Sequence, residues 1–81
     1  MKNIDKFNLE YIENFKLYIG ILKDEKEFSI VGILIKNEEV VEYCETIGMP
    51  DYRTVVEIFN ILRNNKVFPS HFYNIIDDMY S

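Results

Sequence analysis

The side chains best suited to catalysis are scarce in this chain of 81 residues. It has one histidine, His71, and one cysteine, Cys44, and on a helix the hydroxyl of Ser70 would point about 100° away from His71. A nucleophile with its base, a zinc site or a calcium loop each needs several such side chains at a fixed spacing. The three glycines are isolated, so they form no phosphate-binding loop. The sequence therefore predicts no enzyme activity, no metal site and no cofactor.

Acidic side chains are concentrated in one part of the chain. Between Asp24 and Glu45 there are seven acids and two lysines, and elsewhere seven acids balance seven bases, so the whole net charge of −5 lies in this segment. Such a segment repels nucleic acids and membranes and attracts basic proteins. We therefore expect it to bind a partner with a basic surface, such as a nuclease or a polymerase. The predicted contact residues are Asp24, Glu25, Glu27, Glu38, Glu39, Glu42, Glu45 and, as an aromatic anchor, Tyr43.

The elements that would position these acids follow from the spacing of the apolar residues. The chain between residues 3 and 15 has Ile4, Phe7, Tyr11 and Phe15 at helical spacing, which predicts an N-terminal helix.

Two apolar runs rich in Ile and Val follow this predicted helix. They extend from Leu17 to Leu22 and from Phe28 to Ile35 around a short charged stretch, which predicts a β-hairpin. Because these runs are nearly continuous rather than alternating, we expect both faces of the strands to be covered.

Residues 37–48 fit two structures. As a strand, Val40 to Ile47 would pair with the preceding apolar run through a tight turn at Asn37 and Glu38. As a helix, the segment would be capped by Asn37 and would end at Gly48. The strand is favoured because an isolated hairpin needs a further partner to be stable.

The C-terminal part predicts two helices. The first is capped by Asp51 and carries an apolar stripe from Val55 to Leu62, and the second starts near Ser70. The expected fold is a single α+β domain over residues 1–81. It has an N-terminal helix, a three-stranded antiparallel meander whose third strand has a helical alternative, and two C-terminal helices.

The N-terminus and the apolar runs indicate where the protein resides. Asp5 interrupts the apolar stretch that a signal peptide would need, and the longest apolar runs are shorter than the roughly 20 residues of a membrane-spanning helix. A single cysteine excludes an internal disulfide. We therefore expect a cytoplasmic protein that does not bind membranes, acting in the host cytoplasm if it is encoded by a phage.

This order of elements, with the acids gathered around the strands and loops, resembles small acidic anti-CRISPR-type inhibitor proteins of phages. The resemblance is one of architecture and includes no diagnostic motif. Proteins of that kind occupy the basic nucleic-acid groove of a nuclease with carboxylates that stand in for phosphates. The resemblance therefore implies that the acids from Asp24 to Glu45 mimic a nucleic acid.

Two other functions are open. The segment from Val40 to Leu62 is similar to a helix-turn-helix, which implies a small transcription regulator, although its helix carries few cations for contacts with DNA phosphates. Direct binding of nucleic acid is therefore not expected to be strong. Alternatively, the six tyrosines and six phenylalanines are numerous enough to form the interface of a homodimer or of a larger homo-oligomeric structural subunit.

Overall fold

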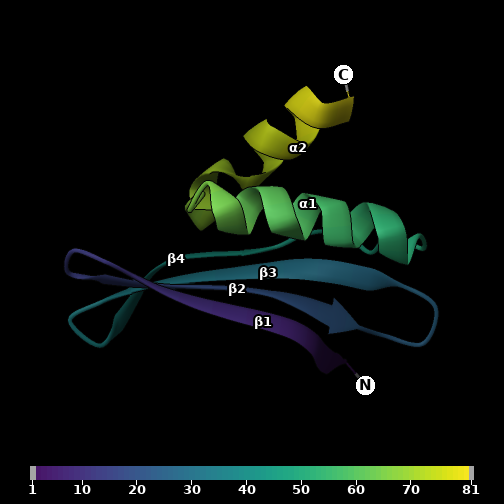
Figure 1. Ribbon diagram of the computed structural model, residues 1–81. Helices are drawn as coiled ribbons and strands as arrows, with labels where there is room; N and C mark the ends of the chain where they lie inside the picture. Colours follow the sequence, from purple (N-terminus) through teal and green to yellow (C-terminus); the bar gives the residue numbers. More distant parts are fainter. Residues whose placement is uncertain (1, 81) are drawn as a thin grey trace.

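The computed structural model describes residues 2–80. It contains four antiparallel strands in the spatial order β1-β2-β3-β4, followed by helices that lie on one side of the sheet (Figure 1). The elements are β1 (Asn3–Ile12), β2 (Phe15–Lys23), β3 (Phe28–Lys36), β4 (Glu39–Glu45), α1 (Tyr52–Asn64), the short 3-10 helix η1 (Pro69–His71) and α2 (Phe72–Tyr80). The fold is α+β, but it has four strands rather than the predicted three.

The predicted N-terminal helix over residues 3–15 is wrong, because these residues form β1 and the start of β2. Phe7, Leu9 and Tyr11 alternate with polar residues, and this alternation places them on one face of a strand that pairs with β2 along its whole length. The hydrogen bonds and the packing offered by β2 outweigh the helical spacing of the same residues.

A β-bulge interrupts the pairing of β1 with β2. Ile4 pairs with Leu22 and Lys6 pairs with Ile21, so Asp5 is the extra residue. The hydroxyl of Tyr52, at the start of α1, donates a hydrogen bond of 2.6 Å to the Asp5 carboxylate. The bulge is thus tied to the helix layer.

The third connection of the sheet is the predicted tight turn. Asn37 and Glu38 have φ angles of 52° and 65°, as a two-residue type I′ hairpin turn requires. Residues 39–45 then form β4, so the helical alternative for this segment is excluded. The segment from Val40 to Leu62 consequently contains one strand and one helix, and not the two helices of a helix-turn-helix.

The core lies between the sheet and α1 with α2. In this part of the chain Asp51 caps α1 as predicted, accepting hydrogen bonds from the Arg53 N–H at 3.2 Å and from the Thr54 hydroxyl at 2.8 Å. Gly32 lies directly under Phe72, and a Cβ at this position would overlap the phenyl ring. The fully or almost fully buried apolar side chains are Leu17, Ile19, Ile21, Ile30, Leu34, Val55, Ile58, Phe59, Leu62 and Phe72.

Candidate protein-interaction surface

The acids of the predicted contact surface are divided between the two ends of the sheet. Asp24, Glu25 and Glu27 lie in the β2–β3 turn, which is closed by a hydrogen bond of 2.9 Å from the Asp24 N–H to the Glu27 carbonyl. Glu38 and Glu39 lie at the β3–β4 turn. The nine residues of β3 separate the two groups, which is roughly 30 Å at about 3.3 Å per residue. The structure therefore shows two acidic ends and no single acidic patch made of these residues.

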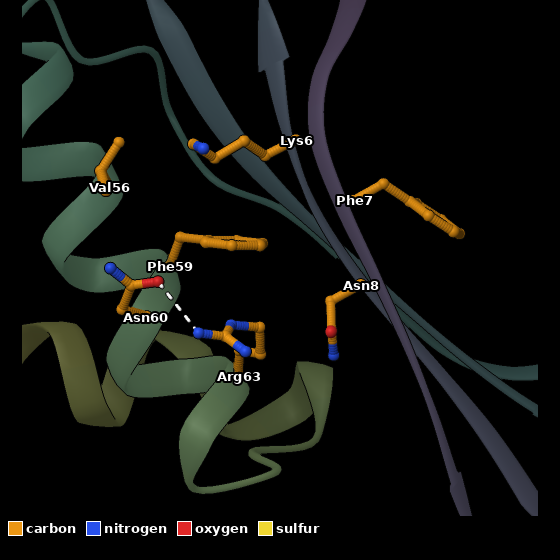
Figure 2. A pocket seen from close by; sticks show the side chains of 7 residues that line it. All are labelled: Lys6, Phe7, Asn8, Val56, Phe59, Asn60 and Arg63. Atoms are coloured by element: carbon orange, nitrogen blue, oxygen red, sulfur yellow. Dashed lines mark hydrogen bonds between the residues drawn. The ribbon is translucent and has the colours of Figure 1, made fainter.

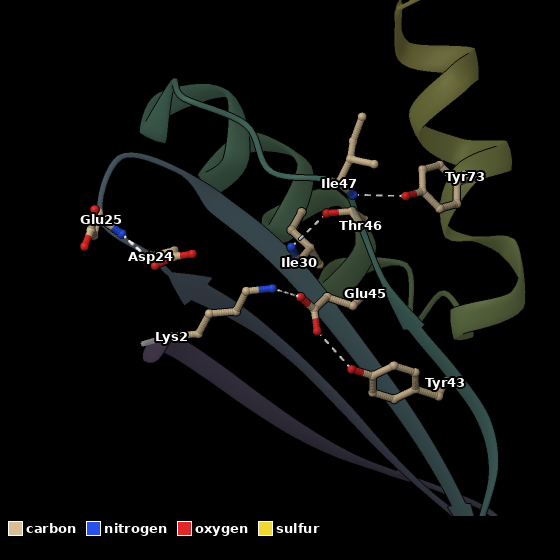
Figure 3. Close-up of polar contacts among 9 residues, drawn as sticks. All are labelled: Lys2, Asp24, Glu25, Ile30, Tyr43, Glu45, Thr46, Ile47 and Tyr73. Atoms are coloured by element: carbon tan, nitrogen blue, oxygen red, sulfur yellow. Dashed lines mark hydrogen bonds and ion pairs between the residues drawn. The ribbon is translucent and has the colours of Figure 1, made fainter.

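The remaining predicted residues lie on β4 and have partners within the chain. The Glu42 carboxylate accepts a hydrogen bond of 3.0 Å from the backbone N–H of Ser70, on the side of the helices. The Glu45 carboxylate, on the opposite side, pairs with the ammonium of Lys2 and accepts a hydrogen bond of 3.0 Å from the Tyr43 hydroxyl (Figure 3). The structure thus brings Tyr43 and Glu45 together and directs Glu42 away from them.

The ion pair of Lys2 and Glu45 shifts the titration of the groups around it. The hydrogen bond from Lys2, followed by that from Tyr43, lowers the pKa of the Glu45 carboxyl. The hydrogen bond to Glu45 raises the pKa of Lys2 and the pKa of the Tyr43 hydroxyl. Each shift strengthens the charge state that the group already has at neutral pH, so none of them creates a proton donor or acceptor suited to catalysis.

The single histidine and the single cysteine lie in different environments. His71 is exposed in η1, whereas Cys44 is half-buried in β4, where burial raises the pKa of its thiol and disfavours the reactive thiolate. Among the residues that the structure describes, no three His, Cys, Asp or Glu side chains are grouped so that they could hold a metal ion.

A groove of about 320 Å³ lies between β1 and α1 (Figure 2). Within it the guanidinium of Arg63 lies 5.9 Å from the centre of the Phe59 ring and donates a hydrogen bond of 3.4 Å to the Asn60 side chain. The groove is lined by Lys6, Phe7, Asn8, Val56, Phe59, Asn60 and Arg63. It has a cationic character, but its arginine is already engaged by neighbours on its own helix.

Apolar side chains from all four strands lie on the face of the sheet that the helices leave uncovered, which we call the open face. Its residues, assigned from the strand register, are Ile4, Phe7, Leu9, Tyr11, Tyr18, Leu22, Val31, Ile33, Ile35, Val40 and Tyr43. Ile4 and Tyr11 are each 69% exposed, and Tyr43 is 59% exposed. The rings of Phe7 and Tyr18 are in contact, with their centres 5.3 Å apart.

The open face contains a hollow of about 230 Å³ that spans the four strands. Gly20 lies within its lining and adds no side chain, and a Cβ at this position would lie 3.8 Å from the Phe7 ring. The lining residues are Ile4, Phe7, Tyr18, Gly20, Leu22, Val31, Ile33 and Tyr43. Figure 3 shows Lys2 and Glu45 meeting across one end of this face. The arrangement is suited to receiving apolar side chains or rings.

The open face is not among the predicted sites, although the sequence carries two signals for it. One is the alternation of Phe7, Leu9 and Tyr11, which lies within the segment predicted as a helix from the spacing of Ile4, Phe7, Tyr11 and Phe15. The other is the nearly continuous apolar character of the two central strands, which predicted cover on both faces. Within residues 2–80, α1 and α2 cover one face only.

Among the residues that the structure describes, no helix is both long and apolar enough to span a membrane. The chain belongs to the family described as "Family of unknown function (DUF6514)", whose model matches residues 2–81. No curated protein and no solved structure matches the chain.

Proposed function

We propose that this member of the DUF6514 family is a non-catalytic protein-binding module that binds its partner through the open face. The proposal is carried by the apolar side chains of all four strands, which lie on the face without a helix, while α1, η1 and the first residue of α2, Phe72, cover the opposite face. Exposed apolar surface costs about 25 cal/mol per Å² in water, and contiguous apolar patches above a few hundred Å² mark interaction sites in soluble proteins.

The aromatic side chains of the open face support this use. Phe7, Tyr11, Tyr18 and Tyr43 offer large contact areas and lose little conformational entropy on binding, because each has two rotatable side-chain bonds. Aromatic residues around a hollow are typical of the positions that contribute most of the binding energy in interfaces. The hollow would accept an apolar side chain of the partner and remove both from water.

Binding of a basic partner by the acids, as in an anti-CRISPR-type inhibitor acting in the cytoplasm, stays a prediction. The two acidic ends lie beyond the two ends of the open face. In the present proposal they raise the rate at which a partner with basic edges approaches that face, while apolar contacts provide the affinity.

A photo-cross-linking amino acid at position 11 tests the proposal in cells that naturally make the chain. Tyr11 lies on the open face, and Tyr80 on α2, which is 56% exposed, provides the matched control position. We expect cross-linked protein adducts from position 11 and few from position 80. Equal adduct yields from the two positions, or none from position 11, would contradict the proposal.

A further inference from the structure

We infer that the occupant of the open face is a second copy of this chain, packed sheet against sheet in a twofold symmetric dimer. The inference rests on the proposed use of the open face and adds the identity of the partner. Three features of the face lead to it, namely its area, its charge and its shape.

The area of the open face comes close to half of the smallest stable dimer interface. Four strands about 4.8 Å apart, with nine residues at about 3.3 Å each, give a face of roughly 19 Å by 30 Å. Two such faces, taken as flat rectangles, bury roughly 1,100 Å², and side chains that project from the sheet add to this area. Stable interfaces bury about 1,200–2,000 Å². In the proposed dimer, one copy of the sheet would cover most of the other, with the inner side chains interdigitating as in a β-sandwich.

The charge of the open face allows two copies of an acidic chain to meet there. Each copy carries a net charge of −5, so contacts through the acidic ends would be repulsive. By the strand register, the charged strand residues on the open side are Lys16 and Glu45, and Glu45 is neutralised by Lys2. Two lysines and one glutamate give this side a net charge of +1, which makes it the part of the sheet where self-association is least opposed.

The shape of the face provides both a hollow and an exposed ring, as a reciprocal contact needs. It carries the hollow around Phe7 and Gly20, and it also carries the protruding ring of Tyr11, which is not part of the hollow's lining. Tyr11 follows Phe7 by four positions along β1, which is about 13 Å. In a twofold contact each copy supplies the same patch to the other, so a hollow and a ring on one face can pair reciprocally.

Sedimentation equilibrium of the purified chain over a series of concentrations tests the inference. We expect a species with twice the chain mass of 9.7 kDa. Tyr11→Lys should raise the dimer dissociation constant at least about tenfold, since it introduces a desolvated charge on both copies, whereas Tyr80→Lys should leave it unchanged. Because the contact is apolar, 0.5 M salt should not dissociate the dimer, whereas salt would weaken a contact made by the acids.

Circular dichroism checks whether Tyr11→Lys folds. A second pair of variants provides an independent test if it does not. Ile4→Lys on the open face and Ile47→Lys outside the strands replace residues that are 69% and 74% exposed. Only the first should weaken the dimer. Equal effects of the two, or a dimer that resists both Ile4→Lys and Tyr11→Lys, would overturn the inference.

A wild-type chain that stays monomeric at every concentration would also contradict the inferred dimer. The cross-linking experiment then tests the proposed function separately. Adducts from position 11 with a different protein would leave the proposed function standing with another partner. A monomer without such adducts would contradict both.

Discussion

Both faces of the sheet carry apolar residues, but the two faces differ in their exposure to solvent. On the helix side, Leu17, Ile19 and Ile21 are at most 1% exposed, whereas on the open face Phe7 is 56% and Tyr43 is 59% exposed. Apolar character alone therefore does not decide which face becomes a core. The helices of the described chain cover one face, so the apolar residues of the second face have no covering layer within residues 2–80.

The largest expected effect comes from truncating one ring on each face. Phe72 is fully buried against the sheet, so Phe72→Ala should lower the free energy of unfolding by about 3–5 kcal/mol, whereas Phe7→Ala should cost about 1 kcal/mol or less. Urea denaturation in a Tyr11→Lys background, at a protein concentration where sedimentation shows a monomer, measures both losses without a contribution from the dimer. A similar loss for both variants would show that the open face is covered within one chain.

The two glycines in the middle of the sheet report how closely each face is packed. An alanine methyl at Gly32 would overlap the ring of Phe72, so Gly32→Ala should destabilise the fold by about 1–3 kcal/mol. At Gly20, on the open face, the nearest atoms to a new Cβ are the Lys6 carbonyl oxygen at 3.0 Å and Val31 Cγ1 at 3.5 Å, so the overlap is smaller than at Gly32 and we expect a smaller loss. Thermal unfolding should show the larger decrease in Tm for Gly32→Ala. A larger decrease for Gly20→Ala would show that the open face is packed more closely than the helix side, and would contradict the comparison.

The N-terminal cap of α1 contributes to the stability of the helix that covers one face of the sheet. Asp51→Ala removes the acceptor of two hydrogen bonds and should cost about 1 kcal/mol, while Asp51→Asn, which keeps an acceptor, should cost less. Chemical denaturation measures both. If the two variants lose the same amount, the charge of Asp51 matters and its hydrogen bonds do not.

The smallest effect concerns the ion pair at the end of the open face. Lys2 lowers the pKa of the Glu45 carboxyl in the folded state, so its contribution to stability is present above the unfolded pKa of about 4.3 and is lost as the pH falls through the lower folded pKa. Unfolding measured from pH 7 to pH 2 should therefore show Glu45→Gln less stable than wild type at neutral pH, with the difference disappearing in acid. Lys2→Met should reproduce this profile, and a difference that persists at pH 2 would exclude the ion pair as its cause.

Local patterns sufficed where the contacts themselves are local. The β2–β3 hairpin, the turn at Asn37 and Glu38, and α1 with its Asp51 cap are all present as predicted, because turn conformation, capping and apolar periodicity act over a few residues. The N-terminal segment failed because its apolar residues fit a helix and a strand at once. Leu9 decides between them in hindsight, since it would lie off the helical stripe and completes the alternation with Phe7 and Tyr11.

The candidate site depended on relations between distant strands. The acids were expected to act together because they are close in the sequence, but successive turns of an antiparallel meander lie at opposite ends of the sheet, so Glu27 and Glu38 were certain to be separated once the hairpins formed. The open face was less predictable. Its existence depends on how much of the sheet α1 and α2 can cover, and that is a matter of packing and not of local sequence.

The bulge at Asp5 has a consequence for aggregation. The outer edge of β1 has no neighbouring strand in the described sheet, and such an edge can template the pairing of further chains into fibres. The bulge interrupts the regular backbone spacing of this edge, and Tyr52 holds it in place from the first turn of α1. Local unfolding of α1 would break the hydrogen bond between Tyr52 and Asp5, so we expect the edge of β1 to be least protected against pairing when the helix is detached.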